Sequence, residues 1–382
     1  MRILILHSAY RSGPASGENR VVEDEARLLS DAGHQVDTFT PDVGHPSGLR
    51  KIQTGLGAIW SKEAVAEVRR RIVQRKPEIV HCHNLFPALS PAVLRAADGR
   101  APVIVTLHNY RFLCLPATFL RDGQICEDCL NRLPWPGVVH SCYQRSTSGS
   151  AVLASSLVLH KAIGTYRNIR LYIAISDFVR TKHVQGGLSI EQILVKPHFA
   201  WAVEPRQGPG EYFMYLGRLS PEKGVATLLE AWKSVKARLL IVGDGPEASR
   251  LRAAAPPNVE FRGTVDPDEA SALLRHARAL LSPSVSHEGA GKVVLEAYAA
   301  GVPVLVSRAG GLPEVVRDDV TGLILPPTDS RAWADAVDRL LDDTESERMG
   351  RSGWELWADR YSPEQGLVNI ESAYQTAMSD GV

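Results

Sequence analysis

Two acidic side chains, Glu288 and Glu296, flank the start of a predicted helix in the second half of the sequence. Residues 286–291, which precede this helix, include two glycines, and glycine allows a ligand to approach the backbone closely. The helix expected over residues 292–300 presents N–H groups and a partial positive charge at its start, which suits a diphosphate. The candidate binding residues at this point are Gly289, Ala290, Gly291, Lys292 and Val293.

The two acids are expected to have different partners. Glu296 lies about one turn inside the helix, roughly 6 Å along its axis, where a carboxylate can accept hydrogen bonds from both hydroxyls of a ribose. Glu288 precedes the helix and would face a sugar attached to the diphosphate. The alternative is purely structural: Glu288 would favour the helix dipole and Glu296 would lie on a solvated face.

Two cations follow another predicted strand. Arg218 belongs to the sequence Gly217-Arg218-Leu219 and Lys223 to Glu222-Lys223-Gly224, directly after an apolar run at residues 212–216. Each alone would be an ordinary surface cation, but together at one strand end they can neutralise a leaving diphosphate.

Buried strands alternate with helical patterns through most of the chain and are expected to position these residues. The strands predicted in the first half are 3–7, 35–40, 77–81, 103–107 and 172–175, and those in the second half are 212–216, 237–242, 259–261, 279–281 and 302–306. This alternation predicts an α/β protein with mostly parallel sheets covered on both faces. The 382 residues are expected to form two doubly wound, Rossmann-like domains, over 1–200 and 211–362. The C-terminal helix, about 363–382, is expected to fold back onto the first domain, and ligands to bind at the carboxyl ends of the strands, in a cleft between the domains.

Three histidines follow or lie on strands of the first half. His108 comes directly after the strand 103–107 and is expected to project from the strand end. His81 and His83 alternate along one strand face, but two ligands are too few for a metal site, so we interpret them as cleft or core residues.

Gly13 and Gly17 lie in the first strand-to-helix loop, where their spacing does not match the dinucleotide fingerprint GxGxxG.

The second half resembles the donor domain of GT-B glycosyltransferases, specifically the large retaining family 4 (glycosyl transferases group 1). The resemblance is carried by Gly217-Arg218 with Lys223-Gly224, by Gly243-Asp244-Gly245, by the pair Glu288 and Glu296, and by Gly310-Gly311-Leu312-Pro313-Glu314. These motifs occur in the order and spacing of that family, strongly over residues 212–328 and more loosely in the first half.

The resemblance implies a transferase that moves a sugar from a nucleotide sugar, with UDP or GDP expected, to a hydroxyl of a glycan, a lipid-linked saccharide or a small metabolite. It implies that Arg218 and Lys223 bind the diphosphate, Glu288 and His108 contact the transferred sugar, and Glu296 binds the ribose. It also implies that backbone near Gly263 contacts the base, and that Gly17 and Gly217 line the donor site. This sequence differs from the usual pattern in its small Ala290, followed by Lys292, and in Ser16 beside Gly17.

Retention of the anomeric configuration also comes from the resemblance. It implies an oxocarbenium-like transition state in which the leaving diphosphate accepts the acceptor's proton. The expected cations and helix start match this chemistry, whereas a retaining hydrolase uses two carboxylates about 5 Å apart. No catalytic metal is expected, because Asp266 of the sequence Asp266-Pro267-Asp268 has the position of a helix N-cap.

Four cysteines, Cys114, Cys126, Cys129 and Cys142, fall within 29 residues, with the middle pair spaced Cys-x-x-Cys. Four thiolates suit a tetrahedral structural zinc, and the alternative is four buried thiols without a metal. His140 is a further candidate ligand.

Composition and charge bound the remaining possibilities. Residues 1–200 contain 24 Lys and Arg against 16 Asp and Glu, so this half is basic although the whole chain has no net charge. A solvated face accounts for that imbalance, and contact with an anionic membrane surface is the alternative.

No apolar run is long enough to cross a bilayer and no signal peptide is evident, which favours a cytoplasmic protein, with the inner face of the membrane as a peripheral site. No nucleic-acid partner is expected. The alternatives to a glycosyltransferase are a non-catalytic nucleotide-sugar-binding regulator and a GT-B epimerase.

Overall fold

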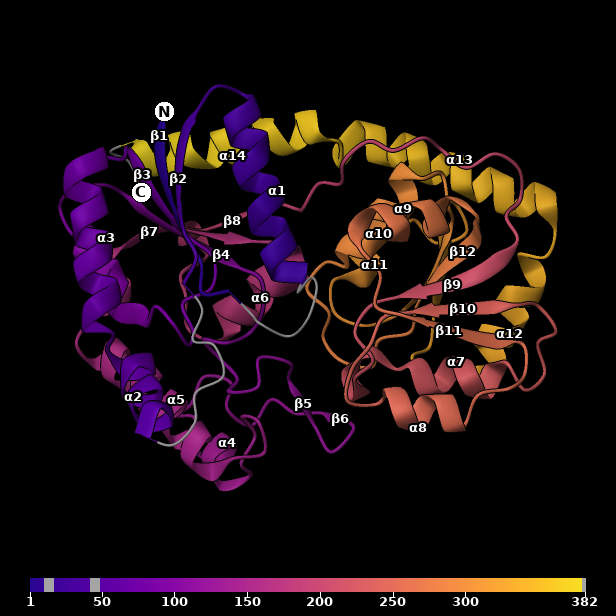
Figure 1. Cartoon of the computed structure of the whole chain (residues 1–382), viewed down its shortest axis with the longest axis horizontal. Coiled ribbons are helices and arrows are strands. Elements are labelled where there is room, and N and C mark those ends of the chain that lie inside the picture. The colour runs from indigo at the N-terminus through magenta and orange to yellow at the C-terminus, as the bar shows by residue number, and fades with distance from the viewer. Residues whose placement is uncertain (10–16, 42–48, 380–382) are drawn as a thin grey trace. The chain divides into compact units, whose positions relative to one another are not determined.

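The computed structural model describes residues 1–9, 17–41 and 49–379. The chain forms two compact units (Figure 1). Unit 1 comprises Met1–Phe119, Cys126–Lys196 and Leu367–Val382, and unit 2 comprises Leu120–Ile125 and Pro197–Gly366. Each unit contains a parallel six-stranded sheet with helices on it, so the predicted α/β fold class with two Rossmann-like units is confirmed.

The sheet of unit 1 has the strand order β2-β1-β3-β4-β7-β8, and all its pairs are parallel. Its strands are β1 (Arg2–Leu6), β2 (Gln35–Phe39), β3 (Ile79–Cys82), β4 (Val103–Leu107), β7 (Ile169–Ala174) and β8 (Ile193–Val195). Every residue of β3 and β4 is buried, as expected for central strands covered on both faces. The carboxyl ends of β1, β3 and β4 therefore meet at one edge, where His7, His83 and His108 follow them.

Serine side chains cap three of the helices of unit 1. The α-helices are α1 (Gly17–Asp31), α2 (Leu49–Ile59), α3 (Lys62–Arg75), α4 (Trp135–Val139), α5 (Thr147–Ala162) and α6 (Asp177–Gln185). Short 3₁₀ helices are η1 (Pro91–Ala97), η2 (Thr165–Asn168) and η3 (Ile190–Gln192). The hydroxyls of Ser61, Ser146 and Ser176 accept from backbone N–H groups at the starts of α3, α5 and α6. Each bond satisfies a donor that has no partner inside the helix.

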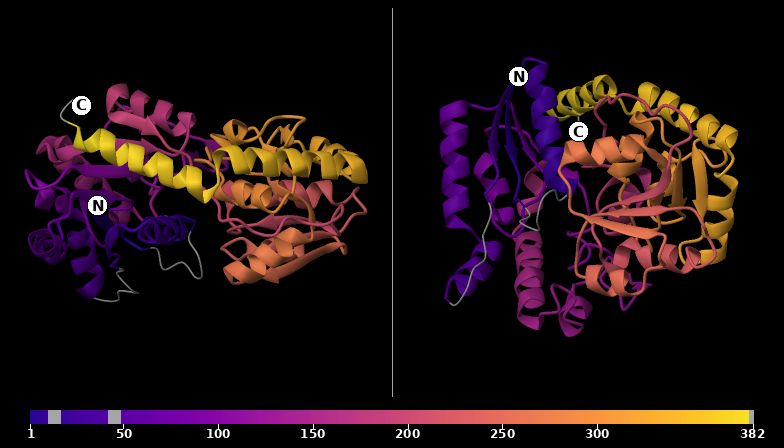
Figure 2. Two further views of the ribbon diagram at one scale, coloured as in Figure 1. Left: turned by 90° about the horizontal axis from the view of Figure 1, so that it is seen from above. Right: turned by 45° about the vertical axis from the view of Figure 1, so that its right-hand side comes forward.

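The C-terminal helix α14 (Pro363–Met378) contributes to the core of unit 1 from Leu367 onward. Its Ile370, Ala373, Tyr374 and Ala377 belong to one buried cluster with strand residues such as Ile5. Helix α1 contributes Val22 and Leu29 to the same cluster. Segments from the two ends of the chain thus pack together in unit 1, and Figure 2 shows α14 as the last yellow helix.

The sheet of unit 2 has the order β11-β10-β9-β12-β13-β14, again entirely parallel. Its strands are β9 (Tyr212–Leu216), β10 (Leu239–Val242), β11 (Val259–Gly263), β12 (Ala277–Ser282), β13 (Val304–Ser307) and β14 (Gly322–Leu325). Residues 120–125 form a separate hairpin of β5 (Leu120–Arg121) and β6 (Gln124–Ile125).

Helices cover both faces of this second sheet (Figure 1). They are η4 (Pro221–Lys223), α7 (Val225–Ala231), α8 (Ala248–Ala253), α9 (Pro267–Arg275), α10 (Lys292–Ala299), α11 (Leu312–Val315), α12 (Ser330–Arg339) and α13 (Asp343–Arg360). Strand side chains alternate between two cores: Met214 packs with residues of α10 and α13, whereas Phe213 and Tyr215 pack with residues of α7 and α12. This alternation follows from the two-residue period of a strand.

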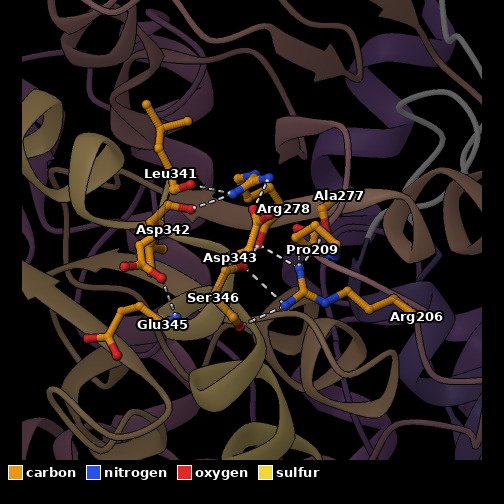
Figure 3. A network of polar contacts seen from close by, with 10 residues as sticks. Arg206, Pro209, Ala277, Arg278, Leu341, Asp342, Asp343, Glu345 and Ser346 are labelled. Carbon is orange, nitrogen blue, oxygen red and sulfur yellow. Dashed lines mark hydrogen bonds and ion pairs between the residues drawn. The ribbon is translucent and has the colours of Figure 1, made fainter.

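The segment between the two predicted domains is packed against unit 2 rather than extended as a spacer. The Arg206 guanidinium donates to the carbonyls of Pro209, Ala277, Arg278 and Ser346 at 2.7–3.2 Å (Figure 3). Arg278 in turn bonds the end of α12 and pairs with Asp343 at 2.8 Å. This network fixes the entry of the chain into β9 and the start of α13.

The Asp266 carboxylate accepts from the backbone N–H of Glu269 at 2.8 Å, so its predicted role as the N-cap of α9 is confirmed. Within the part of the chain that the structure describes, no helix has the length and apolarity needed to cross a membrane.

Candidate active site

Loops at the carboxyl ends of neighbouring strands gather the candidate residues of unit 2. Arg218 and Lys223 follow β9, and Glu288 follows β12, which pairs directly with β9. The loop holding Gly310 follows β13, the next strand in the sheet. Because all these strands are parallel, their carboxyl ends lie at one edge, and the motifs meet there.

A close ion pair joins two of these loops. Lys223 Nζ lies 2.6 Å from Glu288 Oε1, and the side chains are 32% and 16% exposed. The hydroxyl of Ser284 donates to the same carboxylate oxygen at 2.6 Å. The backbone N–H of Val285 donates to the Glu222 carbonyl at 2.9 Å, which joins the loops a second time.

The charges of this pair are mutually stabilised. Burial disfavours the ionised carboxylate, but the attraction of Lys223 and the hydrogen bonds from Lys223 and Ser284 outweigh it and lower the pKa of Glu288. Burial likewise disfavours the ammonium group, but Glu288 outweighs it and raises the pKa of Lys223. Both groups are therefore charged at neutral pH.

Two glycines allow the backbones to come this close. A Cβ on Gly224, at φ +66°, would lie 2.0 Å from the Pro283 carbonyl oxygen. A Cβ on Gly310, at φ +59°, would lie 2.2 Å from the Glu288 carbonyl oxygen. The adjacent Gly311 donates its N–H to that carbonyl at 2.8 Å. The glycine motifs around β9 and β13 therefore hold Lys223 and Glu288 in place.

Arg218 lies on the exposed part of the same edge. Its side chain is solvent-exposed, and its carbonyl accepts a 2.7 Å hydrogen bond from the hydroxyl of Tyr215. The charge of Arg218 also acts on Lys223, where it opposes protonation. Arg218 and Lys223, which were predicted to act jointly, thus lie close enough for their charges to interact.

Helix α10 begins as predicted, at Lys292, directly after Gly291. Gly291 has no side chain that could cap the helix, so the N-cap residue itself covers none of the first-turn N–H groups. Ala290 is buried, whereas Gly289, Lys292, Val293 and Glu296 are half-buried. Glu296 lies in the second turn of α10, and Glu288 lies before the helix, in the order that the sequence predicts.

Two glycines of the predicted donor site lie at the ends of β9 and β11. Gly217 donates its N–H to the Val242 carbonyl at 3.0 Å, and the Gly263 carbonyl accepts from Gly243 at 2.7 Å. The Gly-Asp-Gly motif at residues 243–245 therefore bridges the strand ends that carry Gly217 and Gly263.

In unit 1, His108 follows β4 and is bonded to a second histidine. His83 Nδ1 lies 2.8 Å from His108 Nε2. Burial is the main cause that lowers the pKa of both imidazoles well below the usual value, with smaller effects from neighbouring His7 and Lys196. Both rings are therefore neutral at physiological pH.

Gly17 is the first residue of α1, whereas Gly13 and Ser16 lie outside the described residues. The next residue, Glu18, accepts a 2.6 Å hydrogen bond from the side-chain amide of Asn109. The start of α1 and the end of β4 are thus linked beside His108.

A buried ion pair beneath His83 was not predicted from the sequence. Lys196 Nζ lies 2.6 Å from Glu25 Oε1, with both side chains at most 2% exposed. Glu25 lies on the same face of α1 as Val21, Val22 and Leu29, all buried, and an acid within this apolar stripe is the signal that sequence reasoning missed.

Glu25, His81 and His83 form a group whose potential ligand atoms lie within 4.8 Å of one another, and no other such group occurs among the described residues. The surroundings argue against a metal there. The Lys196 ammonium already neutralises Glu25, and both ring nitrogens of His81 lie within hydrogen-bond distance of hydroxyls, those of Tyr374 at 2.9 Å and Thr106 at 2.7 Å. We therefore interpret the group as a polar core.

Of the four clustered cysteines, Cys129 lies near the other three. Cys129 interacts electrostatically with Cys114, Cys126 and Cys142, and no disulfide joins any cysteine of the chain. Backbone N–H groups of residues 117–119 bond to the Cys114 sulfur, and that of Gly137 bonds to the Cys129 sulfur. Their four sulfur atoms do not all lie within 4.8 Å of one another. His140, the further candidate ligand, is exposed at the end of α4.

Family comparisons cover almost the whole chain. Residues 15–199 match the family described as "Glycosyltransferase Family 4", and residues 210–343 match "Glycosyl transferases group 1". The second match contains the loops with Arg218, Lys223, Glu288 and Glu296.

Individual relatives agree with this assignment. The chain is 32% identical over 387 residues to a GDP-mannose-dependent alpha-(1-6)-phosphatidylinositol monomannoside mannosyltransferase of Mycobacterium tuberculosis, covering 93% of each sequence. It is 30% identical over 333 residues to a phosphatidyl-myo-inositol mannosyltransferase of Mycobacterium leprae, covering 84% of this chain and 79% of that one. Among solved structures, Anabaena HepE in complex with UDP-glucose shares the fold, with a TM-score of 0.67, 18% identity, and coverage of 98% of this chain and 100% of the other.

Proposed function

This chain belongs to glycosyltransferase family 4, and we propose that it takes a sugar from a GDP- or UDP-linked donor and transfers it to a hydroxyl acceptor with retention of the anomeric configuration. The observation that carries the proposal is the Lys223–Glu288 pair, 2.6 Å apart beside the start of α10. Lys223 offers a cation to a diphosphate and Glu288 offers an acid to a sugar, and both lie at the carboxyl ends of β9 and β12.

The proposed donor site divides the ligand among three groups of residues. Lys223, Arg218 and the first N–H groups of α10 bind the diphosphate. Glu296 binds the ribose, and backbone at Gly263 contacts the base. Glu288 binds the transferred sugar, and His108 contacts that sugar during turnover. Gly17, Gly217 and residues 289–293 line the donor.

In the proposed reaction, the bond between the anomeric carbon and the diphosphate oxygen breaks while the acceptor oxygen bonds to that carbon. The proton of the acceptor hydroxyl passes to the leaving diphosphate, so the transfer needs no additional base. Lys223 and Arg218 stabilise the negative charge that develops on the leaving group, which is where preorganised cations contribute most. The protein otherwise acts by positioning the reactants.

The relatives suggest which substrates to test first. GDP-mannose and phosphatidylinositol-type acceptors occur in the name of the M. tuberculosis relative, and UDP-glucose occurs in the HepE complex. We therefore propose incubating the enzyme with GDP-mannose or UDP-glucose and an inositol-containing or glycan acceptor. The expected result is a new glycoside whose anomeric configuration, determined by NMR, equals that of the donor. An inverted product would contradict retention, and failure of every pair to react would contradict these acceptor classes.

We also propose a structural Zn²⁺ held by Cys114, Cys126, Cys129 and Cys142, with the ion drawing the thiols together. Burial raises the pKa of the Cys114 and Cys129 thiols, and backbone N–H groups bonded to both sulfurs partly oppose that effect. Support for the site comes from the gathering of four sulfur ligands in one segment, a set that suits a tetrahedral zinc. The ion would hold a segment whose hairpin, β5 and β6, has no buried residue. It would have no part in the transfer step.

Peripheral contact with an anionic membrane surface is a further proposal. Arg70 and Arg71 of α3 are engaged by Glu67 and Asp37, so the basic helix itself is partly neutralised. Stronger support comes from Leu133, Trp135 and Val139, which are 55–76% exposed close to Arg132. Co-sedimentation with phosphatidylglycerol vesicles tests this contact: Trp135→Ser should reduce binding, and equal binding to neutral vesicles would contradict it.

A further inference from the structure

A surface cavity of about 570 Å³ lies in unit 1, at the amino ends of three strands. Its lining residues directly precede β4, β7 and β8, which are neighbours in the sheet. His108 follows the other, carboxyl end of β4, a strand whose five residues span roughly 16 Å. The cavity and His108 therefore lie at opposite edges of the same sheet, and no residue of the proposed donor site lines the cavity.

Three arginines line this cavity: Arg100, Arg167 and Arg170. The other lining residues are neutral, and two of them, Asn168 and Gln192, carry side-chain amides. Among the residues that the structure describes, no acidic or aromatic one contributes to the lining. Cations gathered in a concave surface concentrate their field on a ligand, so the cavity favours an anion.

Local contacts hold two of these arginines at the cavity. Arg100 Nη1 donates to the Ala96 carbonyl at 3.3 Å. The stem of Arg167 passes over Gly164, where an added Cβ would lie 3.4 Å from Arg167 Cδ. Both arginines are exposed, and neither forms an ion pair within the described part of the chain. Their charges are thus available to a ligand.

The acids closest in sequence do not neutralise the lining. Asp98 and Glu191 lie beside lining residues in the chain but are not part of the lining, and Glu191 accepts a hydrogen bond from the Ser189 hydroxyl. Arg170 is held in another way, because its Nη2 donates to the Ser379 carbonyl at 2.6 Å. The positive charge that a ligand would meet therefore comes first from Arg100 and Arg167.

The lining also indicates what kind of anion fits. A guanidinium presents a planar fork of N–H donors that matches the oxygens of a phosphate group. The amides of Asn168 and Gln192 can donate to and accept from hydroxyls. A volume of about 570 Å³ is that of a site for a small organic ligand and exceeds the need of a bare phosphate ion. Without an aromatic ring on which a base could stack, the lining favours a polyol phosphate over a nucleotide.

We propose that this cavity is a second anion-binding site, which binds the phosphate ester of a polyol through the guanidinium groups of Arg100 and Arg167. Glycerol phosphate is a simple ester of this class, and it occurs both as a free compound and as the headgroup of phosphatidylglycerol. The proposal goes beyond the transfer reaction and does not depend on it, because the two sets of residues do not overlap.

Calorimetric titration with glycerol 1-phosphate tests the free form of the ligand. The full chain is used with Lys223→Met/Glu288→Met, so that the proposed diphosphate site contributes little to binding. In this background Arg100→Gln/Arg167→Gln should weaken binding about tenfold or more, because charge-assisted hydrogen bonds are lost.

Two further variants separate specific binding from general charge. Arg331→Gln/Arg351→Gln removes the same charge from exposed positions of α12 and α13 and should leave binding unchanged. Arg100→Lys/Arg167→Lys keeps both charges and should restore part of the affinity. All variants should melt at the temperature of their parent chain, because every substituted arginine is exposed.

Co-sedimentation with phosphatidylglycerol vesicles tests the lipid form, with Trp135→Ser present throughout to remove the other proposed membrane contact. Binding that is lost in Arg100→Gln/Arg167→Gln and is absent with phosphatidylcholine would identify the ligand as a lipid headgroup if the free ester does not bind. Binding of the free ester would identify a soluble ligand. The proposal is overturned if neither form binds, or if the cavity variant binds as tightly as Arg331→Gln/Arg351→Gln.

Discussion

Lys223 and Glu288 form a 2.6 Å ion pair between the loops that follow β9 and β12. In the proposed mechanism these residues bind different parts of one ligand, the diphosphate and the sugar. A donor must therefore enter at a pair that is already charged and already positioned. The pair keeps each residue in its charged form until the ligand supplies a new partner.

The first prediction concerns the division of labour between the two acids. Glu296→Ala should weaken GDP or UDP binding about 10- to 150-fold, the effect of losing a charge-assisted hydrogen bond of 1.5–3 kcal/mol. Glu288→Ala should leave nucleotide affinity within about threefold and lower kcat about 100-fold or more. Calorimetric titration and steady-state kinetics measure the two quantities. Equal losses of nucleotide affinity in the two variants would contradict this division.

The second prediction concerns stability and pH. Lys223→Met leaves Glu288 half-buried without its cation and should reduce the free energy of unfolding by about 1–3 kcal/mol. Lys223→Met/Glu288→Met should recover most of that loss, because it removes the unpaired charge. Denaturant unfolding measures both variants. A double variant that is less stable than the single one would contradict the pairing.

The pKa of Glu288 is lowered in the folded protein, so its contribution to stability is present above the ordinary glutamate pKa, about 4.3, and is lost as pH falls through the folded value. The stability difference between wild type and Glu288→Gln should therefore be full at neutral pH and shrink below about pH 4. A difference that grows on acidification has the wrong sign.

The third prediction tests the backbone that holds Glu288. Gly310→Ala adds a Cβ that would meet the Glu288 backbone at 2.2 Å, at a φ that disfavours alanine. We expect a loss of at least about 1 kcal/mol of stability, the cost of a strained backbone, together with a lower kcat. Gly57→Ala is the control, because nothing lies within 4 Å of the added atom in α2. Wild-type turnover in Gly310→Ala would show that this contact does not position Glu288.

The fourth prediction is about one zinc ion per chain in protein purified without chelators, measured by elemental analysis. Cys126→Ser and Cys129→Ser should lose the metal and melt at lower temperature, because a structural zinc contributes directly to folding. Cys82→Ala should keep the metal, since Cys82 is buried in β3, outside the cysteine segment. Wild-type protein without zinc at this level would end the proposal.

Much of the fold follows from local sequence. The run at residues 103–107 was predicted with the bounds of β4, because a strand buried on both faces is continuously apolar. Strands β8 and β14 were not predicted from the sequence. The β5–β6 hairpin was missed because its residues are exposed or half-buried, although Asp122-Gly123, both at positive φ, is a turn signal.

The candidate site was only partly predictable. The predicted parallel strands were enough to place Lys223 and Glu288 at strand ends. The ion pair between them also depends on the close approach of Gly224 to Pro283 and of Gly310 to Glu288, which the sequence does not reveal. The Glu25–Lys196 pair joins residues 171 positions apart, so no local pattern contains it. His108 was predicted from its strand end, but its partner His83 was identified as a binding neighbour only in the structure.

The central claim is that the edge of unit 2 with Lys223, Glu288 and α10 binds a nucleotide-sugar donor. The most direct test is a thermal-shift screen of the whole protein against UDP-, GDP-, ADP- and TDP-sugars, because a ligand that binds only the native state raises the melting temperature. We predict that at least one raises it, and that Lys223→Met/Glu288→Met, which keeps the fold without these charges, loses most of the shift. A melting temperature that no nucleotide sugar changes, or a full shift in the double variant, would contradict the claim.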